Sequence, residues 1–351
     1  MNSLTFFDPQ PEANDEVQEE QSELYEHFSL CIDKGQGPLR IDKFLATRIE
    51  NASRNKIQAA AKAGNILVND RPVRSNYKIK PGDHLSIVLS FPPREIEIIP
   101  ENIPVQIVYE DDDLVVVNKE AGMVVHPAFG NYTGTLVNAL TYYFDHQHKL
   151  GLKATPHLVH RIDKNTSGIL IVAKNEIAQS LIARELYYHR IDRKYVALVW
   201  GDFKEDKGTI TGHVGRNLRD RKTMSVFPSG EHGKHAVTHY RVMERFRYTT
   251  LVECTLETGR THQIRVHMKH IGHPVFNDEA YGGNQILKGT TFTKYKQFIE
   301  NCFRIMPRHA LHARYLGFIH PTTGKLLEFD SELPADMTQV VEKWREYVQL
   351  P

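Results

Sequence analysis

The spacing of hydrophobic and polar positions changes several times along the chain, and each change predicts a different element. Residues 39–46 and 54–63 carry apolar side chains at helical spacing, and Gly64 is a typical helix stop. Residues 66–73 predict a short hairpin, and residues 84–89 predict a further strand. We therefore expect a first compact unit made of two helices and a small sheet.

Beyond this unit, strand and helix patterns follow each other less regularly. Two strands with an acidic turn are expected over 107–119, a helix over 135–144, and a fully buried strand over 169–173. A helix over 176–189 and a strand over 194–199 come next. Since this order departs from strict strand–helix–strand alternation, we expect an α+β domain with a mixed, largely antiparallel sheet.

The length of the chain and its prolines predict more than one domain. A chain of 351 residues exceeds an ordinary single domain. The segment 92–106 is punctuated by prolines and is expected to be a linker. The predicted division is a tail over 1–37, a first unit over 38–91, this linker, and a larger domain over 107–351.

Composition narrows the class of protein. Apolar residues make up 40% and charged residues 25% of the chain, which is ordinary for a globular protein. No apolar run approaches about 20 residues, so we expect no transmembrane helix and no membrane partner. The N-terminus has no basic start with an apolar core, so no signal peptide is expected. The three cysteines are scattered, which favours a reducing cytoplasm over a disulfide framework.

Charge is distributed unevenly. The net charge is +1, but residues 1–26 contain eight acidic residues and no Lys or Arg. This acidic tail is expected to be disordered, and the remaining body is basic. Residues 39–90 contain ten basic and four acidic residues. Such an excess of positive charge in one small unit is typical of a surface that binds the phosphates of a nucleic acid.

The clearest candidate for chemistry is Asp163, within the run His-Arg-Ile-Asp-Lys-Asn-Thr-Ser-Gly over 160–168. The apolar run 169–173 follows directly, so the loop would present one acid at the end of a buried strand. An Asp before Asn-Thr-Ser-Gly is also a good turn former, because its carboxylate accepts backbone N–H groups. A turn does not need the preceding His-Arg, and this favours a functional interpretation of the whole block.

A second candidate is Tyr195, in the amphipathic strand pattern of residues 191–201. A tyrosine in such a strand can simply fill the core, and that is the simpler interpretation of this residue taken alone. A ring at the edge of a site can instead stack on a nucleobase, with its hydroxyl available for proton transfer.

A third block covers residues 256–267. Gly259 is expected to end a strand, and Arg260–His267 is expected to form the first turns of a helix. Helical spacing would then bring Thr261 and Arg265 onto one face. Taken alone, this block can be a basic helix that binds phosphate. That interpretation is compatible with a role of the same block in a catalytic site.

The histidines at 267, 270 and 273 raise the question of a metal site. Their spacing allows two ligands on one helix face, but the block lacks a partner cysteine and a His-Glu-x-x-His pattern. We therefore expect no metal here, and surface or RNA-facing histidines are favoured.

The three blocks, in this order, resemble the catalytic motifs of RNA pseudouridine synthases of the RluA/RluD type. The resemblance implies that Asp163 is the catalytic acid, that Tyr195 stacks on the target base, and that Arg265 forms an ion pair with the acid. It also implies that Ile264 packs near the base. The target uridine must leave its stack, and Arg161 is suited to fill the space it vacates.

Residues 39–90 resemble the S4-type RNA-binding module, a small α/β unit, through Arg-x-Asp-Lys-Phe-Leu and Gly-x-Ile-x-Val-Asn. Cations of such a module are expected to contact phosphates and to set position. Residues 272–282 and 308–313 also match the synthases, whereas 283–306 is an insertion of undetermined role. The residues predicted to bind the RNA substrate are Arg54, Lys56, Lys62, His160, Arg161, Arg260 and Ile264.

The implied activity is the isomerisation of uridine to pseudouridine in RNA. Large-subunit (23S) ribosomal RNA is the expected substrate and transfer RNA the second one, with no DNA, no cofactor, no metal and a monomeric, cytoplasmic enzyme. The sequence leaves open which uridine is modified, and whether Asp163 acts as nucleophile, base or electrostatic stabiliser. The alternatives are a non-catalytic RNA-binding protein of ribosome assembly and, more distantly, a metal hydrolase.

Overall fold

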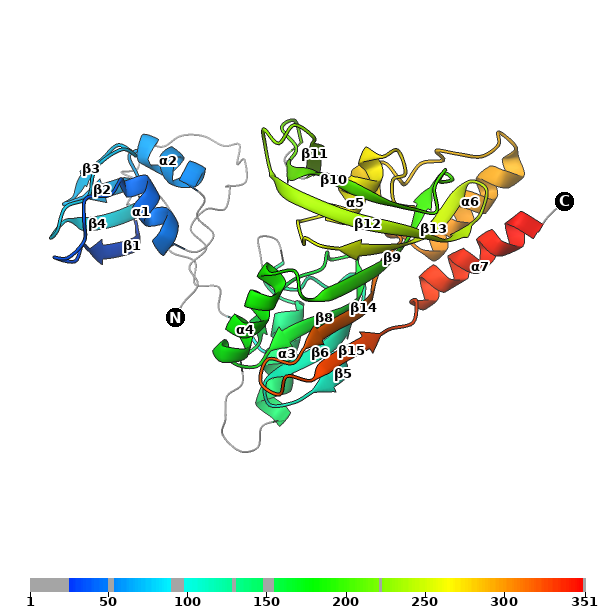
Figure 1. Cartoon of the computed structure of the whole chain (residues 1–351), viewed down its shortest axis with the longest axis horizontal. Coiled ribbons are helices and arrows are strands. Elements are labelled where there is room, and N and C mark those ends of the chain that lie inside the picture. The colour runs from blue at the N-terminus through cyan, green and yellow to red at the C-terminus, as the bar shows by residue number, and fades with distance from the viewer. Residues whose placement is uncertain are drawn as a thin grey trace, which may run out of the picture. The chain divides into compact units, whose positions relative to one another are not determined.

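The chain folds into two units, Met1–Glu97 and Ile98–Pro351 (Figure 1). The computed structural model describes residues 25–49, 54–89, 98–127, 131–147, 155–220 and 223–349. Both units combine helices with mainly antiparallel strands, so the predicted α+β class is confirmed. The acidic residues before position 25 lie outside the described residues.

The described part of the first unit has two helices and a four-stranded antiparallel sheet in the order β1-β4-β2-β3. Its core is apolar, with Ile41, Leu45 and Ile57 of the helices fully buried. The tight turn at Asn69 and Asp70 has φ of 49° and 61°, which Asn and Asp tolerate well. The elements are β1 Tyr25–Cys31, α1 Ile41–Arg48, α2 Arg54–Lys62, β2 Ile66–Val68, β3 Arg71–Pro72 and β4 His84–Leu89.

Strand β1 corrects the predicted tail. The range 1–37 was expected to be disordered, but Tyr25–Cys31 pairs with β4 as an antiparallel strand. The acidic composition of the preceding residues masks a short apolar alternation at Phe28 and Leu30, and both side chains pack against the core of the unit. The ordered unit therefore begins before residue 38.

The second unit is built on an eleven-stranded sheet in the order β11-β10-β12-β13-β9-β14-β8-β6-β5, with β15 on β14 and β7 on β8 (Figure 1). Within the described residues its pairs are antiparallel except β8 with β14. The strands are β5 Gln106–Glu110, β6 Leu114–Lys119, β7 His157–Leu158, β8 Ser167–Ala173, β9 Asp192–Trp200, β10 Lys207–Arg216, β11 Met224–Phe227, β12 Lys234–Arg245, β13 Thr249–Leu256, β14 Leu311–Ile319 and β15 Leu326–Asp330. The helices are α3 Leu136–Gln147, α4 Glu176–Tyr187, α5 Gln263–His270, the short 3₁₀ helix Glu279–Tyr281, α6 Thr293–Ile305 and α7 Ala335–Gln349.

Both faces of the sheet are covered around β6 and β8. Alternate residues of a strand point to opposite faces, so Val115 of β6 packs in the cluster with Leu140 of α3. Val116 points the other way and packs in the cluster with Ile182 of α4. Because both faces are buried, these strands have almost continuous apolar sequences.

The insertion 283–306 has a structural role. It contains helix α6, whose Tyr295 and Ile299 are buried in the main core with Trp344 of helix α7. The ring centroids of Tyr295 and Trp344 lie 6.5 Å apart. The insertion and the C-terminal helix therefore cover one another, and both join the core.

The second half of the predicted linker belongs to the second unit. Asn138 of α3 donates its side-chain N–H to the carbonyl of Ile99 at 2.8 Å, and the backbone N–H of Gly134 donates to Glu101 at 2.9 Å. Strand β5 already starts at residue 106. Residues 98–106 are thus fixed against α3, while residues 92–97 lie outside the described part. In the part that is described, no helix is long and apolar enough to span a membrane.

Candidate active site

A cavity of about 820 Å³ opens between the loop before β8, helix α4, the strands β9, β13 and β14, and the start of α5. Asp163, before β8, is the only carboxylate among its described lining residues. The cavity is otherwise strongly basic, because five cationic side chains line it. These cations are Arg161, Arg193, Lys234, Arg260 and Arg265.

Asp163 is joined to Arg265, as the resemblance implied. The Nη1 of Arg265 donates to Oδ2 of Asp163 at 2.9 Å. The same guanidinium is held on its other side by Asp278, through Nε at 2.7 Å and Nη2 at 2.8 Å. Asp278 is fully buried, so this bidentate pair fixes the orientation in which Arg265 meets Asp163.

The surroundings of Asp163 favour its ionised form. Burial by itself would raise the pKa of this carboxyl, but His262 and Arg265 nearby lower it, and the net pKa is below the usual value. His262 Nε2 lies 3.8 Å from Oδ1 of Asp163, and its Nδ1 lies 2.8 Å from the hydroxyl of Tyr281. The acid is therefore a carboxylate near neutral pH.

Hydrogen bonds from other segments fix the loop that follows Asp163 at three successive residues, 164–166. Lys119, which is buried, donates its Nζ to the carbonyl of Lys164 at 3.1 Å and to two further carbonyls. Arg308 donates to the carbonyl of Asn165 at 3.1 Å, and Thr166 Oγ1 lies 2.8 Å from Nε2 of His309. These contacts leave the backbone around Asp163 little freedom to move.

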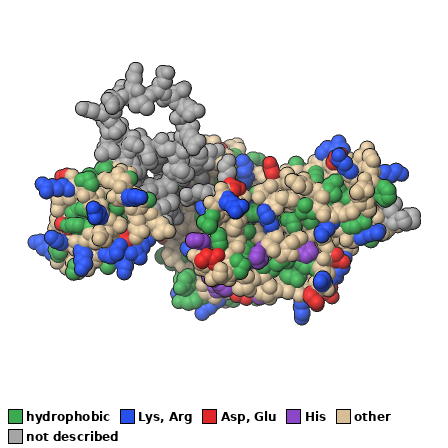
Figure 2. Space-filling view, turned by 90° about the horizontal axis from the view of Figure 1, so that it is seen from above, with side chains coloured by type: hydrophobic (Ala, Val, Ile, Leu, Met, Phe, Trp, Pro, Cys, Tyr) green, Lys and Arg blue, Asp and Glu red, His purple; other side chains and the backbone are tan. Residues whose placement is uncertain are grey.

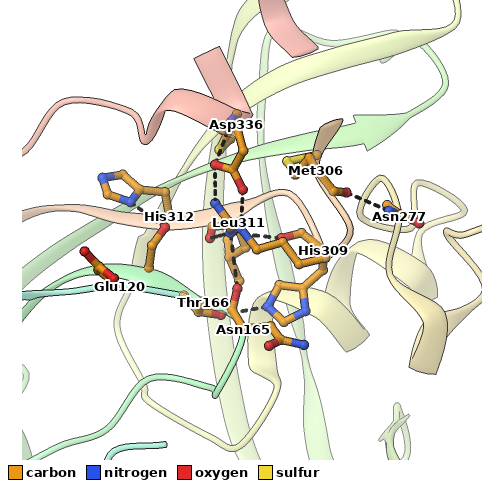
Figure 3. A network of polar contacts seen from close by, with 12 residues as sticks. Glu120, Asn165, Thr166, Asn277, Met306, His309, Leu311, His312 and Asp336 are labelled. Atoms are coloured by element: carbon orange, nitrogen blue, oxygen red, sulfur yellow. Dashed lines mark hydrogen bonds and ion pairs between the residues drawn. The ribbon is translucent and has the colours of Figure 1, made fainter. Parts of the chain in front are cut away.

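Figure 3 shows the segments that meet behind this loop. Asp336 of helix α7 faces the start of β14 and the labelled residues Asn165 and Thr166 of the loop. Both oxygens of Asp336 accept from Arg308, at 2.7 and 2.9 Å. The C-terminal helix is therefore linked to the loop of Asp163 through one buried arginine.

Tyr195 and Ile264 lie in the same cavity as Asp163. Tyr195 of β9 is buried with 8% of its surface exposed, and it lines the cavity together with Ile264 of α5. Burial raises the pKa of Tyr195, so its hydroxyl stays protonated. Among the described residues this hydroxyl has no hydrogen-bond partner, and it is available to a ligand in the cavity.

The helix predicted to start at Arg260 begins at Gln263 instead. His262 is in the left-handed conformation with φ of 56°, which interrupts the helix before that point. Gln263 then fixes the turn: its Oε1 accepts from the backbone of Arg260 and the hydroxyl of Thr258. The expectation that Thr261 shares a helix face with Arg265 is therefore wrong, although both residues line the cavity.

The other residues predicted near the substrate differ in their surroundings. Arg161 is exposed and lines the cavity, whereas Arg260 is half-buried and donates its Nε to the carbonyl of His235 at 3.1 Å. His160 Nε2 accepts from the backbone N–H of Ile171 at 2.9 Å. Burial lowers the pKa of His160 to about 3, so this residue is neutral and supports the loop.

In the first unit, Arg54 has a structural partner. Its Nε donates to Asp42 at 3.0 Å, and this fully buried carboxylate also accepts two bonds from Arg40 and one from Gln58. Lys62 is exposed, and the side chain of Lys56 lies outside the described residues. Lys and Arg side chains are spread over the visible face of this unit in Figure 2.

The histidines His267 and His273 have separate partners within the fold. Nδ1 of the buried His267 lies 2.9 Å from the hydroxyl of Thr238, and Nδ1 of His273 lies 2.8 Å from the carbonyl of Trp200. In the residues described, no group of three His, Cys, Asp or Glu side chains is placed to hold a metal ion.

The sequence interpretation missed four supporting residues of the site. Asp278 and Arg308 were within matched stretches but received no role, and His262 was passed over inside the third block. Lys119 carried no signal apart from its position at the end of a strand. Each of them acts through a contact with a residue distant in sequence, and the sequence alone does not reveal such a contact.

Comparison with known proteins identifies the family. The model of the RNA pseudouridylate synthase family matches residues 113–270, and that of the S4 domain matches residues 39–85. An uncharacterized RNA pseudouridine synthase of Chlorobaculum parvum is 48% identical, over 91% of this chain and 98% of the relative. The ribosomal large subunit pseudouridine synthase D of Zymomonas mobilis is 41% identical, over 85% of this chain and 91% of the relative.

Among solved structures, human RNA pseudouridylate synthase domain containing 4 has a TM-score of 0.53. The similarity extends over 68% of this chain and 93% of the human chain, at 22% sequence identity. At this identity the similarity supports the fold alone. The two matched family models and these relatives together define an enzyme that modifies RNA. The chain belongs to the RNA pseudouridylate synthase family, and the alternatives of a non-catalytic RNA-binding protein and of a metal hydrolase are set aside.

Proposed function

We propose that this enzyme isomerises uridines of large-subunit ribosomal RNA, with Asp163 as the essential catalytic residue. The observation that carries the assignment is the position of Asp163, the one carboxylate among the described residues that line a basic cavity, held by Arg265 at 2.9 Å. A site that only bound RNA would gain nothing from an acid facing a polyanion. The acid is therefore explained by chemistry at the nucleoside.

The isomerisation breaks the N-glycosidic bond of uridine, turns the uracil and joins a ring carbon to the same sugar. A carboxylate can attack the sugar, remove a proton or stabilise positive charge on the ribose, and in each role it must be ionised. The lowered pKa of Asp163 supports this requirement. Nothing is oxidised or consumed in the overall reaction.

The neighbouring residues suit the binding of a flipped uridine. The ring of Tyr195 and the side chain of Ile264 offer an apolar surface on which a base can stack. The hydroxyl of Tyr195 can exchange a proton with the base. Arg161, exposed at the cavity, is suited to fill the gap that the flipped base leaves in the RNA.

The choice of ribosomal RNA rests on relatives. Several proteins 38–41% identical to this chain are named ribosomal large subunit pseudouridine synthase D. The S4 unit supplies a further RNA-binding surface, where exposed cations such as Lys62 are expected to contact phosphates. Monomeric state and cytoplasmic location stay predictions.

Mapping of pseudouridines in ribosomal and transfer RNA, from cells with and without the gene, tests the substrate. We expect sites in large-subunit ribosomal RNA to be lost on deletion and restored by the intact gene. Loss of sites from transfer RNA alone would contradict the proposed substrate.

The substitution Asp163→Asn tests the catalytic residue. It keeps the size of the side chain and removes its charge, so turnover should vanish while affinity for RNA changes little. The same cells complemented with this variant should lack the same pseudouridines. Restored modification would show that another residue carries the chemistry.

A further inference from the structure

Three arginines are buried among the described residues of the second unit, and one of them differs from the others. Arg265 and Arg308 are each held by both oxygens of a carboxylate, Asp278 and Asp336 respectively. Arg193 is buried to the same degree, with 7% exposed, but forms no ion pair with any described residue. Among the described residues, nothing compensates its charge.

The surroundings of Arg193 leave space for its guanidinium but give it few partners among the described residues. The residue lies on β9 two positions before Tyr195, on the same face of the strand, and both line the cavity. Its Nη2 makes one long bond of 3.5 Å to the carbonyl of Glu257, and its Nε is buried without a partner among the described residues. A side chain at Gly259 would place its Cβ 2.7 Å from Nη1 of Arg193, so the glycine makes room for this group.

A buried cation without a counter-ion is unfavourable, because water is removed and nothing replaces it. Proteins keep such groups where a ligand supplies the opposite charge. The cavity around Arg193 contains five cations and one acid, and that acid is already engaged by Arg265. None of the described residues supplies the missing counter-charge, and a ligand in the cavity can supply it.

We propose that Arg193 binds a backbone phosphodiester of the RNA next to the target uridine, a role that rests on the cavity of Asp163 being the active site. A phosphodiester brings a negative charge and two acceptor oxygens, which match the planar fork of a guanidinium. Nη1, which forms no hydrogen bond with the described residues, is the donor available for it. The contact would position the sugar of the target nucleotide over Asp163 from the side of β9.

The test compares Arg193→Met and Arg193→Lys with Arg241→Met. Arg241 is an exposed arginine of β12, paired with Glu253 at 3.1 Å and outside the cavity lining, so it controls for the loss of one charge. The substrate is total RNA from cells that lack the gene. It is used at several KCl concentrations to obtain kcat/KM, and the Tm of each free protein is measured in parallel.

For Arg193→Met we expect kcat/KM to fall by about tenfold or more, as for loss of a charged hydrogen bond. The slope of log kcat/KM against log salt should become less steep by about 0.7–0.9, as for loss of one phosphate contact. The Tm of the free protein should stay the same or rise, since an uncompensated buried charge is removed. Arg193→Lys should restore the slope, and Arg241→Met should leave all three quantities near wild type.

Other results would overturn the proposal. A lower kcat/KM with an unchanged slope would mean that Arg193 contacts a neutral group such as a uracil carbonyl. A lower Tm together with lower activity, not rescued by Arg193→Lys, would assign it a structural role. Wild-type behaviour would remove it from the site. Because total RNA contains every candidate substrate, product found only outside ribosomal RNA would contradict the proposed substrate without affecting this comparison.

Discussion

The substitution Arg308→Met should weaken both the fold and the catalysis of this enzyme. Arg308 joins Asp336 of helix α7 to the carbonyl of Asn165 in the loop that follows Asp163. Methionine keeps much of the side-chain volume but donates to neither partner. Asp336 then loses its counter-ion, and the loop loses one of the contacts that hold it behind Asp163.

The expected cost follows from burial. Loss of one partner from a buried ion pair costs about 3–5 kcal/mol. Arg308 is 7% exposed and Asp336 is 27% exposed, so solvent reduces the penalty toward the lower end, about 3 kcal/mol. For a unit of this size each kcal/mol lowers the Tm by about 2–4 °C, which gives a decrease of about 6–12 °C.

Thermal unfolding and steady-state kinetics, measured well below the Tm, separate the two effects. Asp336→Asn is the matched control, because it removes the ion pair but leaves the bond from Arg308 to Asn165. It should lower the Tm while keeping kcat near wild type, whereas Arg308→Met should lower both. The reasoning fails if Arg308→Met keeps the wild-type Tm and kcat, or if Asp336→Asn reduces kcat by as much.

Three further predictions concern charge. Arg265→Met removes the counter-ion of Asp163 and should raise the pKa of this acid, so the acidic limb of the kcat profile should move to higher pH; an unmoved limb would contradict the pairing. Burial lowers the pKa of Lys119 from 10.5 to about 7. Between pH 7 and pH 10.5 the unfolded chain therefore keeps a proton on Lys119 that the folded chain has lost. The free energy of unfolding should rise with pH in this range, by up to about 1.4 kcal/mol per pH unit. Urea unfolding at pH 7 and 9.5 should show this rise in wild type and a smaller one in Lys119→Met, and equal rises would refute it. Replacing Lys43 and Lys62 by Gln should weaken RNA binding and reduce its salt slope by up to about 2, and an unchanged slope would show that these exposed lysines do not contact phosphate.

The course of the fold was largely predictable because its central strands and helices have strong periodicity. The buried run 169–173 lies within β8, and the helix after it starts at Glu176 as expected. Strand β1 was missed because its alternation is short and follows an acidic stretch. The start of α5 was misplaced because a tertiary contact, not local preference, accompanies the left-handed backbone of His262 beside Tyr281.

The candidate site was predictable only where a motif named the residue. Asp163 and Arg265 are 102 positions apart, and their contact was expected solely from the resemblance. Asp278, which orients Arg265, and Lys119, which supports the loop, depend on how strands and loops are brought together in space. Periodicity and composition do not contain that information, so both roles needed the structure.

Two carboxylates, Asp163 and Asp278, share Arg265, and this determines which part of a nucleotide can approach Asp163. Asp163, Arg265 and Asp278 together carry one net negative charge, because one cation faces two anions. Arg265 is therefore not free to attract phosphate toward Asp163, whereas Arg161, Arg193, Lys234 and Arg260 line the cavity and attract it. The parts of a nucleotide are therefore placed in the cavity according to their charge. The uncharged sugar and base can bind next to Asp163, and the phosphates bind to the cations.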